Sequence, residues 1–175
     1  MYNKGPFIKH PKIPIARPFA DAHQHDEQFI DRTIELALRG QTAGEVPIGA
    51  IVVDEMGAIL ATATNLREQN STVLGHAELI ALHRACRKRK SWRLTGCTLY
   101  VTLEPCFMCT GALVQARISR VVFGAFDPKG GALGSLADLS IDKRLNHNFN
   151  VRGGVKAHEC GLLLKEFFKK KRIRV

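Results

Sequence analysis

The alternation of helical and strand-like segments constrains the fold of this chain more than any other feature. A helical pattern over residues 76–89 precedes a strand-like run over 98–103, and a second helical pattern over 105–116 precedes another over 120–124. A helix that connects two strands of one sheet allows the strands to run parallel. We therefore predict crossover helices beside a sheet that is at least partly parallel.

The flanking segments complete this prediction. Runs rich in β-branched residues over 46–53 and 58–63 enclose a turn, which is typical of a β-hairpin. We also expect a helix from Asp26, as its N-cap, to about Arg39, a short strand over 151–155 and a final helix over 158–171. The predicted fold is α/β: a three-layer α/β/α sandwich with a mixed sheet of about five strands.

Length and charge narrow the class of protein. The 175 residues suit one domain, and the chain contains no apolar run of the roughly 20 residues that span a bilayer. The net charge of +10 favours a polyanionic partner such as nucleic acid over a membrane. Residues 1–24 contain four prolines among basic residues, which predicts a flexible basic arm before a folded domain over 25–175. With no secretory signal apparent, we expect a cytoplasmic protein.

Two short motifs carry the chemistry. His76 and Glu78 stand at the start of one predicted helix, and Cys106 and Cys109 at the start of another. Helix N-termini favour thiolates, and Zn²⁺ prefers nitrogen and sulfur ligands in a tetrahedron. His76, Cys106 and Cys109 therefore predict a zinc site with a fourth position open to water, as catalytic sites have.

Glu78 fits the role of a general base. Two thiolates neutralise the formal charge of the metal, so a base beside the bound water is useful. Other interpretations treat Cys106 and Cys109 as a redox pair, or add Cys86, Cys97 or Cys160 as a fourth ligand of a structural zinc. A redox pair leaves His76 and Glu78 unexplained.

Together, these motifs match the pattern of zinc nucleobase deaminases. Over about residues 27–172 the chain resembles the bacterial tRNA-specific adenosine deaminases, whose fold is cytidine deaminase-like. The segments that carry the resemblance are 45–50 (EVPIGA), 65–68 (NLRE), 76–78 (HAE), 99–106 (LYVTLEPC), 121–125 (VVFGA) and 131–136 (GALGSL). Gly75 departs from the family, which more often has a larger residue there, and could loosen the start of the helix.

The resemblance implies hydrolytic deamination of the adenosine at the first anticodon position of tRNA, specifically an arginine tRNA with the anticodon ACG. It also implies a homodimer, one zinc ion per subunit, no organic cofactor, and a tRNA anticodon loop as partner. By the same resemblance, Asn65 binds the target nucleoside, Val46 and Ile48 pack near the base, and Asp127 contacts the RNA backbone. If the resemblance is set aside, Asn65 is interpreted simply as a turn residue that follows a strand.

The C-terminal segment mixes aromatic and basic residues. Phe167 and Phe168 suit stacking on unpaired bases, and Lys169, Lys170 and Arg172 suit phosphates. An amphipathic helix with a solvated basic end is the alternative. A second basic run, 87–90, lies at a predicted helix end, where both RNA contact and interaction with the helix dipole remain open.

Two other functions compete with the one the resemblance implies. A deaminase of a free base or nucleoside, such as cytosine, cytidine or guanine, has the same zinc motif, but a small neutral substrate needs no polycation. A non-catalytic RNA-binding protein stabilised by zinc has no use for Glu78.

Overall fold

A single mixed sheet of five strands organises the chain. The computed structural model describes residues 22–173, and most of the proline-containing arm predicted over 1–24 lies outside them. The strands lie in the order β2-β1-β3-β4-β5, with the β1–β2 and β1–β3 pairs antiparallel and the β3–β4 and β4–β5 pairs parallel. Their bounds are Gly49–Val53 for β1, Ile59–Thr64 for β2, Thr98–Leu103 for β3, Arg120–Ala125 for β4 and Asn150–Arg152 for β5.

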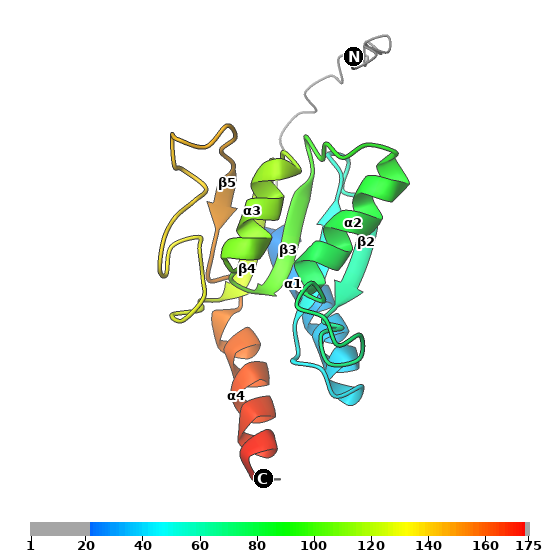
Figure 1. The fold of residues 1–175 in the computed structure, drawn as a ribbon, viewed down its shortest axis with the longest axis vertical. Helices are drawn as coiled ribbons and strands as arrows, with labels where there is room; N and C mark the ends of the chain where they lie inside the picture. The colour runs from blue at the N-terminus through cyan, green and yellow to red at the C-terminus, as the bar shows by residue number, and fades with distance from the viewer. Residues whose placement is uncertain (1–21, 174–175) are drawn as a thin grey trace, which may run out of the picture.

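Helices cover both faces of this sheet (Figure 1). α2 (Ala77–Arg89) and α3 (Phe107–Gln115) pack on one face, and α1 (Ala22–Thr42) and α4 (Ala157–Ile173) on the other. The predicted three-layer α/β/α sandwich with a mixed five-stranded sheet is thus confirmed. Within residues 22–173, none of the helices combines the length and the apolar character needed to cross a membrane.

The alternating side chains of the central strand serve two cores. Leu99 and Val101 of β3 are fully buried against α2 and α3, while Tyr100, between them, is buried against α1. Successive side chains of a strand point to opposite faces, so a strand with helices on both sides is apolar at nearly every position. This explains why residues 99–101 of β3 form an unbroken apolar run.

Asp26 is a correction to the sequence prediction. It is not the N-cap of α1, because that helix already includes Ala22. The Asp26 carboxylate is fully buried and accepts hydrogen bonds from Arg120 at 2.7 Å, Arg152 at 2.6 Å and the Tyr100 hydroxyl at 3.1 Å. It therefore connects α1 to three strands of the sheet.

Two predicted element starts are also displaced by prolines. β1 begins at Gly49 rather than at residue 46, because Pro47 has no N–H to donate to a sheet. α3 begins at Phe107 with Cys106 as its N-cap, so Pro105 precedes the helix instead of occupying its first turn. Both shifts leave the functional residues in the predicted order.

Candidate metal centre and nucleic-acid surface

The two predicted metal-binding segments meet at one end of the sheet. His76 is the N-cap of α2 and Cys106 is the N-cap of α3, and neither side chain caps its own helix. Each helix leads into one of the parallel strands β3 and β4, so both helix N-termini lie beside the carboxyl ends of these strands. In α/β sheets, this is where ligands usually bind.

His76, Cys106 and Cys109 form a cluster with the dimensions of a zinc site. The Nδ1 atom of His76 lies 3.4 Å from the Cys109 sulfur and 3.8 Å from the Cys106 sulfur, and all three ligand atoms lie within 4.8 Å of one another. Around a tetrahedral Zn²⁺, nitrogen and sulfur ligands lie roughly 3.5–3.8 Å apart. The donor set and its spacing therefore fit this metal.

The protonation of the cluster also suits a cation. The hydrogen bond from Cys109 lowers the pKa of the Cys106 thiol to about 3, with a further contribution from His76. The pKa of Cys109 is raised, because its thiol is hydrogen-bonded to Cys106, is buried, and as a thiolate would be repelled by Glu78 and Cys106. A divalent cation removes this repulsion and lets both sulfurs bind as thiolates.

Glu78 lies in the first turn of α2, two residues from His76. The side chain is only 4% exposed, and its Oε2 atom has no hydrogen-bond partner among the described residues. Burial raises the pKa of this carboxyl, although the nearby His76 opposes the shift. An unpartnered buried carboxylate oxygen reduces stability, so its position beside this candidate metal site makes Glu78 a candidate for a chemical role.

Other cysteines do not join this cluster. Among residues 22–173, His76, Cys106 and Cys109 form the one group of at least three His, Cys, Asp or Glu side chains with metal-binding spacing. Cys160 is buried in the core on the opposite face of the sheet, and Cys97 is buried against the guanidinium of Arg89. The geometry thus gives no fourth cysteine ligand for a structural zinc.

Asn65 lies directly beside the centre. Its side chain is 3% exposed, and its Oδ1 atom accepts a hydrogen bond from the backbone N–H of Ala77 at 3.0 Å. Its own N–H donates to the carbonyl of Ile48 at 3.2 Å, so the predicted base-packing residue Ile48 is its neighbour. Val46 and Ile48 are both half-buried, and Ile48 packs against the core on this face of the sheet.

Gly75 is required by the backbone at this point. A Cβ atom there would lie 2.7 Å from the carbonyl carbon and oxygen of Leu66, whose N–H donates to the Gly75 carbonyl. The close packing explains the glycine at this position, while a looser start of α2 stays a prediction. The glycine permits the close approach that brings the loop over 66–75 back to His76.

Sequence reasoning missed two buried glutamates that hold the walls of the site. Glu104 is 2% exposed and accepts hydrogen bonds from the backbone N–H groups of Asp127, Leu133 and Ser135, each at 3.0 Å, and from the Ser135 hydroxyl. Burial alone would raise the pKa of Glu104, but these hydrogen bonds lower it below its ordinary value. The loop over 127–135 is thereby fixed beside Cys106.

Glu45 performs the equivalent task on the other wall. It is fully buried and accepts hydrogen bonds from the backbone N–H groups of Arg67 at 3.1 Å and Gln69 at 2.9 Å. The only available sequence signal was that Glu45 and Glu104 each stand close before a proline in a segment that resembles the family. Their charges suggested exposure, because acidic residues are rarely buried without partners.

The predicted RNA-contact residues fall in two places. Asp127 is half-buried in the loop after β4, where its side chain accepts a hydrogen bond from the N–H of Lys129. The basic residues Lys169, Lys170 and Arg172 are exposed near the end of α4. This end of α4 extends beyond the sheet (Figure 1).

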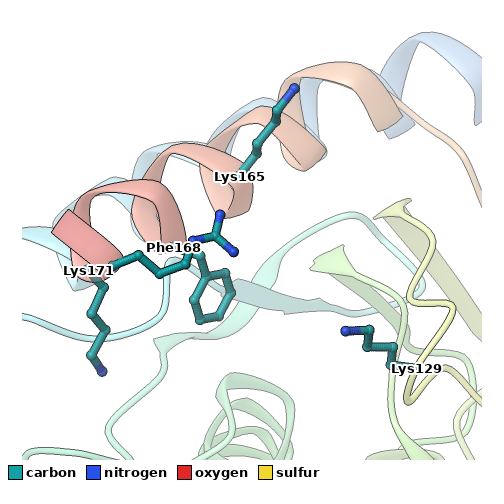
Figure 2. Close-up of a pocket in the computed structure, with 5 residues that line it drawn as sticks. Lys129, Lys165, Phe168 and Lys171 are labelled. Carbon is teal, nitrogen blue, oxygen red and sulfur yellow. The ribbon is translucent and has the colours of Figure 1, made fainter. Parts of the chain in front are cut away.

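The two aromatic residues of α4 differ in exposure. Phe167 is half-buried, while Phe168 is 44% exposed, and their rings meet edge to face with centroids 5.4 Å apart. Phe168 lines an open groove of about 1040 Å³ between α4 and the loop after β4 (Figure 2). The other residues that line it are all basic: Lys129, Lys165, Lys171 and Arg172.

Comparison with known proteins reveals extensive similarity. Residues 24–172 match a protein-family model described as MafB19-like deaminase. The tRNA-specific adenosine deaminase of Bacillus subtilis is 48% identical to the chain over 147 residues, which are 84% of this chain and 91% of that protein.

Two solved structures are similar as well. One, from biochemical and structural studies of A-to-I editing by tRNA:A34 deaminases at the wobble position, has a TM-score of 0.75 and 36% identity, covering 78% of this chain and 99% of that one. Guanine deaminase from Bacillus subtilis has a TM-score of 0.55 and 38% identity, but covers only 57% of this chain and 64% of that one.

Proposed function

Because this chain belongs to the family of tRNA-specific adenosine deaminases, we propose that it converts the wobble adenosine of tRNA to inosine by hydrolysis, with release of ammonia. The observation that carries the proposal is the buried Glu78 with its unpartnered oxygen beside the cluster of His76, Cys106 and Cys109. The cluster can hold the ion that activates water and Glu78 can act as the base, and hydrolytic deamination requires these two functions side by side.

In this proposal His76, Cys106 and Cys109 hold one Zn²⁺ per subunit. An ion held there would supply an activated water as the nucleophile for the purine carbon bearing the amino group. Glu78 accepts one proton of the attacking water and passes it to a ring nitrogen. It then takes the remaining proton of the added hydroxyl and passes it to the amino group, which leaves as ammonia. Its burial keeps bulk water from competing for the same proton.

The target adenosine is held by the residues around the centre. Asn65 binds the nucleoside while Val46 and Ile48 pack against the base, and the half-buried state of the last two supports this. Asp127 contacts the RNA backbone from the loop that Glu104 fixes. A base in a single-stranded loop can be turned into such a site at little cost in unstacking.

The C-terminal part of α4 extends the RNA contact. Phe168 is exposed in a groove whose other lining residues are basic, which suits a stacked base between phosphates. Phe167 supports Phe168 through their edge-to-face contact, and Lys169, Lys170 and Arg172 add charge nearby. These five residues form the proposed C-terminal RNA contact.

The finer points of the proposal follow the resemblance. The substrate is an arginine tRNA with the anticodon ACG, read through its anticodon loop without an organic cofactor. The domain over 25–175 acts as a homodimer in the cytoplasm, and the exposed Phe107 and Met108 at the start of α3, 49% and 37% exposed, suit a subunit contact.

A tRNA assay separates this function from its rivals. Purified protein is incubated with unmodified tRNA bearing the ACG anticodon, then the tRNA is digested and inosine is measured by mass, with Glu78→Gln protein as control. We expect inosine with the wild type only. Turnover of free guanine, cytidine or cytosine with untouched tRNA would support a free-base or nucleoside deaminase. Zinc-dependent binding of tRNA without any turnover would support a non-catalytic RNA-binding protein.

A further inference from the structure

The basic run over 87–90 is divided by the structure into two groups. Lys88 and Arg89 turn onto the body of the protein: the Lys88 amine donates to the carbonyl of Ile59 at 2.9 Å, and Arg89 pairs with Glu55 at 3.2 Å. Arg89 also donates to the sulfur of Cys97. These two cations therefore have structural partners.

The other cations of this region face solvent. Arg87, Lys90 and Arg93 are exposed, and no carboxylate of the described residues forms an ion pair with them. Between them stands Trp92, which is 53% exposed and has the Arg93 guanidinium 4.0 Å from its ring centroid. We call these four residues the Trp92 surface.

Interaction with the helix dipole explains only part of this surface. Cations near the C-terminus of α2 are favourable there, which accounts for Arg87. It does not account for Trp92 and Arg93, which follow the helix end at Lys90. An exposed tryptophan flanked by unpaired cations is instead the combination that binds single-stranded nucleic acid, through stacking and phosphate contacts.

The Trp92 surface is distant from the metal centre. His76 lies at the start of α2 and Lys90 at its end, and a helix of 13 residues is about 20 Å long. At roughly 3.4 Å per nucleotide, this is about six nucleotides along a strand. The Trp92 surface is also separate from the groove beside α4, because α4 packs on the opposite face of the sheet from α2.

We propose that the Trp92 surface is a second RNA-binding surface, which holds the tRNA several nucleotides away from the edited adenosine. The three cations contact phosphates, and the Trp92 ring stacks on an unpaired base. This inference rests on the proposed function, because it takes tRNA as the polyanion. Two separated contacts favour a structured RNA over a free nucleoside, which cannot reach both.

The test compares two triple variants of the full-length zinc-loaded protein. The first, Arg87→Gln/Lys90→Gln/Arg93→Gln, removes the charges of the Trp92 surface. We expect it to weaken tRNA binding at least about tenfold at 0.1 M salt and to reduce the slope of log affinity against log salt by about two. The loss should appear in the KM for tRNA, with zinc content unchanged.

The control, Arg32→Gln/Arg39→Gln/Lys143→Gln, removes the same charge from exposed positions elsewhere. We expect it to change tRNA affinity less than threefold. Equal losses of tRNA affinity in both triple variants would mean that net charge alone causes the effect, which would overturn the proposal.

A second pair of variants tests the ring itself. Trp92→Ala should weaken tRNA binding about tenfold, whereas Trp92→Phe should retain most of the affinity, because phenylalanine also stacks. Wild-type affinity for Trp92→Ala would refute the stacking role. If the triple variant instead alters the mass of the protein in solution without altering tRNA affinity, the surface is a protein contact. Failure of the wild type to form inosine would refute the deaminase function separately.

Discussion

The side-chain oxygen of Asn65 accepts a hydrogen bond from the backbone N–H of Ala77, between His76 and Glu78. A residue proposed to bind the nucleoside thus also fixes the start of the helix that carries a metal ligand and the base. In the proposed function this one side chain would align the substrate with the reacting groups, and substitutions can separate its two contacts.

Asn65→Asp keeps the acceptor oxygen but replaces the amide donor. We expect the helix start and zinc content to be preserved, while kcat/KM for tRNA falls at least about 100-fold because the nucleoside contact is lost. Asn65→Ala should in addition lower the melting temperature. Full activity of Asn65→Asp would mean that the residue only positions the helix.

Replacing Glu78 with glutamine removes the base but retains the shape of the side chain. Deamination should fall by about 10²–10⁴-fold, the usual contribution of a general base. Stability should be unchanged or slightly increased, because a buried carboxylate without a partner on Oε2 is lost. Inosine formation, zinc content and thermal unfolding of one preparation check all three expectations.

The metal ligands are tested by Cys109→Ser, with Cys160→Ser as the matched control. Cys109→Ser should lose most of the bound zinc and much of the thermal stability, because a bound ion stabilises the folded state. Cys160 is equally buried but belongs to the other core, so its serine variant should keep zinc. Metal analysis with equal zinc in both variants would contradict the ligand assignment.

Gly131 and Gly111 form an informative pair. A Cβ at Gly131 would overlap the carboxylate of Glu104, whereas one at Gly111 would meet nothing within 4 Å. Gly131→Ala should therefore displace the loop over 127–135 and reduce tRNA turnover. Gly111→Ala, within α3, should raise stability by about 0.5–1 kcal/mol. Denaturant unfolding and the KM for tRNA measure the two effects.

The buried ion pairs of Asp26 make the stability of the fold depend on pH. Burial alone would raise the pKa of Asp26, but hydrogen bonds from Arg120 and Arg152 lower it below its ordinary value. A lowered pKa means that this stabilisation is present above pH 4 or so and is lost as the pH falls further. Asp26→Asn should cost about 2 kcal/mol at pH 7, and the difference from wild type should shrink towards pH 3.

The sequence predicted most of the fold, because its elements have clear periodicity and its motifs lie at helix starts. The bounds of β3 were predicted to the residue. The cluster of His76, Cys106 and Cys109 was predicted from the residue types, their spacing and their positions at helix starts, and the structure brings the three together. The roles of Asn65 and Asp127 and the C-terminal RNA contacts stay predictions.

The features that the sequence did not reveal are buried acidic side chains, and they were missed for one physical reason. Asp26, Glu45 and Glu104 are buried acidic residues whose partners lie far away in sequence. Most partners of the two glutamates are backbone N–H groups, which every residue except proline carries and which therefore leave no pattern in the sequence. Only the folded chain shows which loop presents them.

The order of the strands also determines when the metal centre can form. β1 pairs with β3 across the whole of β2 and α2, with Ala50 opposite Val101. Such non-local pairing is slow, because the entropy cost of closing the intervening loop comes before the contacts that stabilise the pair. His76 is held by α2, which packs on β1 and β2, whereas Cys106 follows β3. We therefore expect the cluster to reach its final geometry after this step, with the ion binding an assembled scaffold rather than nucleating it. Excess zinc during refolding should therefore raise the final yield without accelerating the rate-limiting step.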